Sequence, residues 1–258
     1  MKAIWLISKS VLIEAVRRRE IYVIVAVSSL FIGAVMTVNF FEIEGLTKFY
    51  REIALKIMSI ATAITVVVLS SRQLPREFER RTIYPLLARP INRTVFLSGK
   101  LMGVMLSAAF CFILFMLIYI IGTIYLGGKI PWVLFLQYIY LQLFMMLILA
   151  TLCFWLSMML NLDAAITIGI LLYTLAATFM SVSSFIYDYT KAFGRIVLIV
   201  LTWIIPQLSL FDLSGKAVHA EVWEPVSLKT MAILSIYGLT FTLVYFSLAL
   251  LWFRRRPL

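Results

Sequence analysis

Apolar runs of membrane-spanning length recur through this sequence from residue 21 to residue 253. An α-helix needs about 20 apolar residues to cross a hydrocarbon core about 30 Å thick, and at least five runs reach that length. A chain of 258 residues that is 63% hydrophobic and only 14% charged cannot hide so much apolar surface as a water-soluble domain. The sequence therefore predicts an all-α integral membrane protein.

Six transmembrane helices are predicted, bounded by charged clusters and by prolines. They cover residues 21–41, 53–71, 101–126, 133–160, 164–187 and 231–253. The run within residues 196–210 has only a short apolar stretch before Pro206, which favours a re-entrant or interfacial segment over a seventh crossing. The whole chain, 1–258, is interpreted as one membrane domain in which residues 188–229 form an extracytoplasmic region.

Residues 1–20 are predicted to form an amphipathic helix at the membrane interface. Apolar residues recur there at helical spacing and face a basic opposite side. The apolar positions are Ile4, Ile7, Val11, Leu12, Ala15 and Val16. A stripe of this kind favours a helix that lies on the cytoplasmic leaflet.

Basic residues give the chain a net charge of +11, and their distribution predicts its orientation. With six spans and the amino end inside, 15 of the 23 Lys and Arg residues lie on the cytoplasmic side, which is the expected asymmetry. Both termini are then cytoplasmic in a multi-pass protein of the cytoplasmic, or inner, membrane. We attribute the charge to this bias and to contact with membrane lipid, and we expect no nucleic-acid partner.

Residues 72–100, which we call the charged island, separate the second and third apolar runs. The island holds seven of the 23 basic residues and only two acids. Its prolines predict several short elements along the membrane face, because Pro75 is expected to end the helix of the second span and Pro85 and Pro90 to interrupt the rest of the island.

Two interpretations of the charged island remain. A loop that only fixes topology would hold lipid headgroups through its basic side chains. Here, however, the arginines alternate with carboxylates and with apolar residues such as Ile83 and Leu86. This mixture favours docking onto a partner protein, because Arg and carboxylate groups make directed, charge-assisted hydrogen bonds while apolar side chains fill a groove.

The sequence offers no residues for catalysis, for a metal site or for a cofactor site. The phosphate-binding motif GxxxxGK[ST] is absent, and the SGK at residues 98–100 lacks the upstream glycine. The single His219 has no second histidine beside it, and Cys111 and Cys153 lie within predicted spans without metal-ligand spacing. Any ATP-driven work is therefore expected to come from a separate polypeptide.

Small hydroxyl residues follow the second and fifth predicted spans. Such residues can hold helices together, as at a dimer interface, or can line a transport pathway. They are Ser59, Thr62, Thr167, Thr174, Thr178 and Ser181. The sequence leaves both roles open.

Residues 77–100 of the charged island read EFERRTIYPLLARPINRTVFLSGK. This stretch resembles the cytoplasmic loop of ABC-2 type transporter permeases. The amphipathic helix at the start of the chain, the segment PQLSLF at residues 206–211 and the FRRR that begins at Phe253 also resemble this family, especially the branch linked to maturation of multicopper enzymes. The positions that fit the family pattern are Glu79, Thr82, Leu86, Leu87, Arg89, Pro90, Arg93, Gly99 and Lys100. Arg81 departs from it, because the family usually has glycine there.

The resemblance implies a homodimeric membrane subunit that binds two copies of a separate ATPase, and ATP and Mg would bind to that ATPase. The ATPase-coupling residues, in a cytoplasmic coupling helix, would be Arg76, Glu77, Glu79, Arg80, Arg81, Thr82, Arg89 and Arg93. Residues 196–211 would close the outer side of the pathway, with Pro206 and Phe211 as an extracytoplasmic gate.

The implied function is that of a permease moving an unidentified substrate across the membrane with ATP hydrolysed by the partner. The predicted spans carry no ionisable residue at mid-depth, which argues against an ion-coupled carrier. The alternative is a non-transporting membrane anchor that transmits the work of the ATPase to an extracytoplasmic partner protein.

Overall fold

The structure is a computed structural model that describes residues 2–17, 19–36, 43–79, 92–187, 189–190, 193–196 and 206–255. Helices are the only regular elements in these ranges, so the all-α prediction is confirmed for them. The elements are α1 (Lys2–Arg17), α2 (Arg19–Met36), α3 (Ile43–Glu79), α5 (Arg93–Tyr125), α6 (Trp132–Met159), α7 (Leu162–Tyr187), the 3₁₀ helix η1 (Leu208–Phe211), α9 (Ser214–Val218) and α10 (Leu228–Arg255).

Four helices, α3, α5, α6 and α10, are long and apolar enough to cross a membrane. Two shorter apolar helical stretches, Tyr22–Ala34 of α2 and Leu162–Ala176 of α7, coincide with the predicted first and fifth spans. Of the six predicted spans, four therefore have full-length helices within the described residues. The six-span topology itself stays a prediction.

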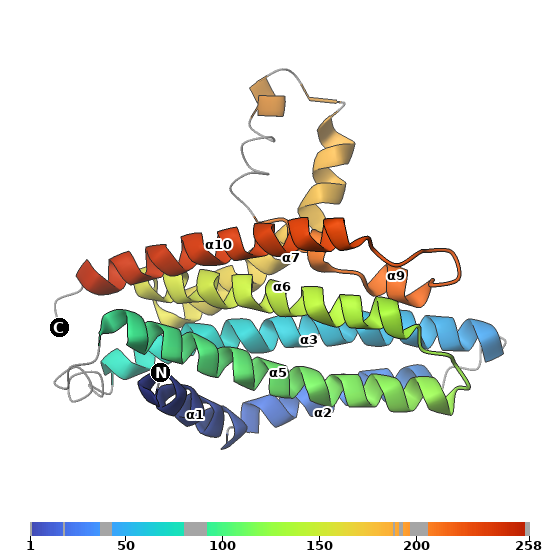
Figure 1. Ribbon diagram of the computed structural model, residues 1–258, viewed down its shortest axis with the longest axis horizontal. Coiled ribbons are helices and arrows are strands. Elements are labelled where there is room, and N and C mark those ends of the chain that lie inside the picture. The colour runs from blue at the N-terminus through green and yellow to red at the C-terminus, as the bar shows by residue number, and fades with distance from the viewer. Residues whose placement is uncertain are drawn as a thin grey trace.

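The long helices lie side by side with both chain termini at one end of the bundle (Figure 1). In the most apolar stretch of both α3 and α6, 67% of the residues are buried, against 22% in α10. Every position from 148 to 154 of α6 is buried, so this part of the helix has no face directed out of the bundle. The centre of the fold is thus built by α3 and α6.

Helix α1 packs against the first turns of α5. Gly99 and Gly103 of α5 make this approach possible, because a Cβ on Gly103 would lie 2.5 Å from the Cβ of Val11. The Ser8 hydroxyl also donates a hydrogen bond to the Gly99 carbonyl at 3.0 Å. Ile7, Val11 and Ala15 of the predicted stripe are buried by these contacts. The buried part of the stripe therefore packs on α5, while Trp5, Leu6 and Ile13 of the same helix are exposed. The position of α1 at the membrane interface stays a prediction.

Helix α3 continues through Pro75 to Glu79, so the prediction that Pro75 ends the second span is wrong. A proline inside a helix removes one backbone hydrogen bond, here the bond to the carbonyl of Ser71, and costs about 3 kcal/mol. The last turns of α3 are held by tertiary contacts that offset this cost. Leu74 is fully buried, and Glu77 forms an ion pair with Lys100 of α5.

The other end of α3 also differs from prediction. The short outer segment 42–52 is helical from Ile43 onward, so that α3 begins well before the predicted start of the span. Helix α7 has close to its predicted bounds, but its last part leaves the bundle (Figure 1, gold). Most of the short apolar run before Pro206 lies outside the described residues.

Candidate functional site: polar networks at the two ends of the bundle

The two ends of the bundle each carry a polar network. We call the end with both termini the island end, and the opposite end the cap end. The cap end is covered by residues 206–223, here the cap segment, which includes η1 and α9. Both networks join α3 to segments far away in the sequence.

At the cap end, three cations of α3 contact the cap segment in antiparallel order. We call this set the cap ladder. Its contacts are Lys56 Nζ to Asp212 Oδ2 at 2.8 Å, Arg51 Nη2 to the Ala217 carbonyl at 2.5 Å, and Lys48 Nζ to Glu221 Oε2 at 2.9 Å. The cap segment is thereby fixed along the first turns of α3.

The contacts of the cap ladder differ in their exposure to solvent. Arg51 is only 7% exposed and also lies 3.4 Å from the Tyr119 hydroxyl. The side chains of Lys56 and Asp212 are 61% and 20% exposed, and those of Lys48 and Glu221 are 45% and 76% exposed. Ion pairs as exposed as these contribute little to stability, so the buried Arg51 is the firmest contact of the ladder.

Asp212 connects the ladder to the start of α9. Its second carboxylate oxygen accepts a hydrogen bond from the Ser214 backbone N–H at 3.0 Å. Burial raises the pKa of Asp212, but hydrogen bonds from Lys56 and Ser214 outweigh burial and leave this pKa below its ordinary value. The group is therefore an anion that holds both α3 and the turn into α9.

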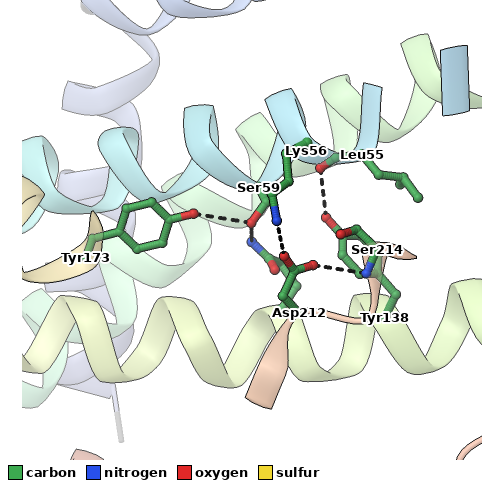
Figure 2. Close-up of polar contacts among 8 residues, drawn as sticks. Leu55, Lys56, Ser59, Tyr138, Tyr173, Asp212 and Ser214 are labelled. Atoms are coloured by element: carbon green, nitrogen blue, oxygen red, sulfur yellow. Dashed lines mark hydrogen bonds and ion pairs between the residues drawn. The ribbon is translucent and has the colours of Figure 1, made fainter. Parts of the chain in front are cut away.

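Next to Asp212 lies a polar cluster that joins three helices (Figure 2). Ser59 of α3 lies 3.4 Å from the Tyr173 hydroxyl of α7 and accepts a hydrogen bond of 3.4 Å from Gln142 of α6. Tyr138 of α6 donates to the Leu55 carbonyl at 3.3 Å. Among the described residues, the amide oxygen of Gln142 has no hydrogen-bond partner although it is buried.

The predicted gate residues Pro206 and Phe211 are both buried in the cap segment. The Phe211 ring lies 6.1 Å from that of Tyr237 on α10, centroid to centroid. Gly238 makes room for it, because a Cβ there would lie 3.3 Å from the Phe211 ring. The backbone N–H of Gln207 donates to the Tyr237 hydroxyl at 3.0 Å. The cap segment is thus attached to α10 as well as to α3.

At the island end, Lys100 of α5 is bound between side chains of α3. Its Nζ lies 2.5 Å from Glu77 Oε1 and 3.3 Å from Gln73 Oε1. The side chains of Lys100 and Glu77 are only 6% and 18% exposed. Lys100 also lies over the Phe96 ring, 5.8 Å from its centroid. A buried cation with these partners fixes α5 against α3.

Arg93 extends this network to α10. Its guanidinium donates to the carbonyls of Phe253 at 2.8 Å and Arg254 at 2.9 Å, which belong to the last turn of α10. A cation at the carboxyl end of a helix also interacts favourably with the helix dipole. The Phe253 ring packs against Phe96 and Phe78. We call Glu77, Lys100, Arg93 and Phe253, with Gln73 and Phe96, the island joint.

The structure places four of the predicted ATPase-coupling residues. Glu79 is exposed at the end of α3 and Arg76 is half-buried beside it, whereas Glu77 and Arg93 belong to the island joint. The other four lie outside the described residues: Arg80, Arg81, Thr82 and Arg89. Their coupling role stays a prediction.

The hydroxyl residues predicted for a pathway or an interface divide into two groups. Ser59 and Thr62 are buried, and Ser59 joins the polar cluster. Thr167, Thr174 and Thr178 are exposed and bond to carbonyls of their own helix. Ser181 lies in the part of α7 whose side chains the structure does not describe. The predicted line of hydroxyls is thus not brought together inside this chain.

Sequence reasoning missed the cap ladder. Lys56, for example, forms its ion pair with Asp212, which is far away in the sequence. The available signal was the recurrence of cations on the first turns of one helix, opposite a loop with acids at 212 and 221. Such a signal gives no register, because each cation could pair with either acid.

The fold and the island sequence agree with a comparison against known families. A family profile described as ABC-2 family transporter protein matches residues 7–258. The chain belongs to this family. Comparison with curated proteins finds no match. As an ABC-2 family member with apolar helices of spanning length, the chain is a multi-pass membrane component of a transport system and is not itself catalytic.

Proposed function

We propose that this chain is the permease subunit of an ABC transporter of the cytoplasmic membrane. The observation that carries the proposal is the family match over residues 7–258, in a chain whose sequence lacks a phosphate-binding motif for ATP. The chain then supplies the path for a substrate, and a separate ATPase supplies the energy. ATP and Mg bind to that ATPase.

The ATPase docks at the island end, which faces the cytoplasm in this proposal. The excess of basic residues in the charged island supports this orientation, as does the position of both termini at the same end. We call residues 80–91 the docking segment. Exposed Glu79 and half-buried Arg76 lie just before it, at the end of α3. The assembly contains two copies of the permease and two of the ATPase.

The cap segment closes the extracytoplasmic side of the pathway, with Pro206 and Phe211 at the closure. Its attachment supports this role, since two of the three cap-ladder contacts are exposed ion pairs that can open at small cost. The polar cluster next to Asp212 offers hydrogen-bonding groups to a substrate once the cap segment has moved away from α3.

Purification of the permease together with a candidate ABC ATPase from the same genome tests the proposal. We expect Glu79→Ala together with Arg80→Ala to reduce ATPase association, and Glu224→Ala, an exposed acid at the cap end, to leave it unchanged. Unchanged association and turnover in the double variant would contradict docking at the island. ATP-dependent substrate movement in vesicles tests transport, and its absence despite binding of an extracytoplasmic partner would support the anchor instead.

A further inference from the structure

The island joint lies at the two points where the docking segment meets the bundle. Helix α3 ends at Glu79 and α5 begins at Arg93, so residues 80–91 are connected to the bundle at these two helix ends. Glu77 lies in the last turn of α3, and Arg93 and Lys100 lie in the first two turns of α5. The chain therefore carries a force on residues 80–91 into these turns.

The joint connects these turns to each other. Without a connection between these turns, a force on the docking segment would rotate the ends of α3 and α5 relative to each other. The rest of the two helices would then not move. The ion pair between Glu77 and Lys100 prevents this, because both side chains are largely buried and their hydrogen bonds have a direction. A buried ion pair is well suited to fixing the register of two helices.

Arg93 adds α10 to the same unit. Its two hydrogen bonds end on carbonyls of the last turn of α10, and the Phe253 ring of that turn packs against α3 and α5. At the other end of the bundle, α3 carries the cap ladder and α10 begins soon after the cap segment. Two of the three helices that the joint connects, α3 and α10, thus also contact the cap segment, which packs on α6 and α7 as well.

We propose that Glu77, Lys100 and Arg93 are positioning residues that transmit movement of the docking segment to the cap segment by moving α3, α5 and α10 as one unit. This inference rests on the proposed function and goes beyond it, because it gives Glu77 and Arg93 a role within the permease. Their side chains are directed into the bundle and bonded there. The ATPase is held by other residues of the charged island.

The test uses the full permease in complex with its ATPase in lipid bilayers. Ala217→Cys provides the reporter, because Ala217 of α9 is fully buried and its carbonyl is bound by Arg51 of α3. A cysteine there should become reactive only when the cap segment lifts. The two native cysteines, Cys111 and Cys153, are fully buried and are replaced by alanine in all samples. The rate of maleimide reaction is measured without nucleotide and with ATP and vanadate.

Three variants separate transmission from folding. In Glu77→Leu with Lys100→Met, the ion pair is replaced by apolar side chains, which often retain stability but do not fix the register. In Glu77→Lys with Lys100→Glu, the ion pair is restored with its charges exchanged. Arg93→Met removes the bond to α10 alone. The matched control is Lys229→Met, which removes an exposed cation that belongs to neither the cap ladder nor the island joint.

We expect ATP and vanadate to change the reaction rate of Cys at position 217 in the otherwise unaltered complex and in the control. The apolar double variant and Arg93→Met should keep ATPase binding but lose this nucleotide effect, and the charge exchange should recover part of it. Arg93→Met also keeps the test decisive if the apolar double variant does not fold.

Three results would overturn the inference. A nucleotide effect kept in both the apolar double variant and Arg93→Met would show that the joint transmits nothing. Loss of ATPase binding in folded variants would show that these residues contact the ATPase directly. No nucleotide effect in the unaltered complex, with ATPase bound, would show that the cap segment is not driven. Failure of the unaltered permease to bind any ATPase would instead remove the proposed function.

Discussion

The cap ladder and the island joint use the same kinds of side chains in different surroundings. Each combines ion pairs with an arginine that donates to main-chain carbonyl oxygen. In the ladder, the Lys56–Asp212 and Lys48–Glu221 pairs have at least one side chain more than half exposed, whereas the Lys100–Glu77 pair of the joint is largely buried. Water and salt compete with the first two pairs and not with the third.

The comparison shows that one helix is held by a buried ion pair at one end and, apart from the buried Arg51, by exposed ion pairs at the other. Exposed ion pairs are worth about 0–1 kcal/mol, while breaking a buried pair by removing one partner costs about 3–5 kcal/mol. Helix α3 carries both kinds. The island end should therefore stay intact in every functional state, and the cap end should open.

The largest effect is expected from Lys100→Met alone. It leaves the carboxylate of Glu77 largely buried without its cation, which should reduce the free energy of unfolding by about 3–5 kcal/mol. Thermal unfolding in detergent measures the loss. Adding Glu77→Leu removes the buried charge and should recover most of the stability. If Lys100→Met alone were as stable as the unaltered protein, the ion pairs at the two ends would not differ in their contribution to stability.

A smaller loss is expected from Gly103→Ala, which tests the packing of α1 at the island end. The new Cβ would lie 2.5 Å from Val11 Cβ and 3.0 Å from the Ser8 carbonyl, so α1 must shift, at about 1–3 kcal/mol. Gly33→Ala is the matched control, because nothing lies within 4 Å of its Cβ. Proteolysis at the amino terminus and thermal unfolding measure the effect.

Asp212→Asn should cost less, about 0.2–1 kcal/mol, because the Lys56–Asp212 pair lies partly in solvent. The effect should depend on pH. Since the pKa of Asp212 is lowered in the folded state, its contribution is complete above the usual value of about 3.9 and disappears as pH falls through the lowered pKa. Unfolding temperatures of the two proteins should differ at pH 7 and converge once the pH lies below the lowered pKa of Asp212. A constant difference would exclude Asp212 as the titrating group.

The smallest effect is expected from neutralising the Lys48–Glu221 pair. Lys48→Gln with Glu221→Gln should leave thermal unfolding unchanged, because both side chains are exposed to solvent and salt. Measurement at low and at high salt sharpens the result. A clear loss of stability at low salt would mean that the outermost contact of the ladder is stronger than its exposure indicates.

The helices were largely predictable from the sequence because a membrane span depends on local composition alone. The runs that became α5, α6 and α10 needed no knowledge of their neighbours. The packing side of α1 was not predictable, since an apolar stripe suits α5 as well as lipid. At Pro75 the local rule gave the wrong prediction. Proline tends to end a helix, but the burial of Leu74 and the contacts of α3 with α5 stabilise the helix beyond it.

The site was less predictable than the fold. The charged island was found from its composition, but the pairing of Glu77 with Lys100, and of Lys56 with Asp212 156 residues away, depends on helix register in three dimensions. A single sequence carries charge and spacing, and these predict that cations need partners. Charge and spacing do not determine which of the nearby acids pairs with a given cation.

The burial of α6 on every side limits how this bundle can rearrange. A helix with an outward face can rotate and exchange one packed side for another, as α10 has room to do. Between residues 148 and 154, α6 has no such side, and rotation would displace close-packed neighbours in all directions at once. In a saturating mutational scan, α10 should show tolerant positions about every 3.6 residues, and this part of α6 should show none. In the proposed transport cycle, we expect α6 to stay in place while the other helices move past it.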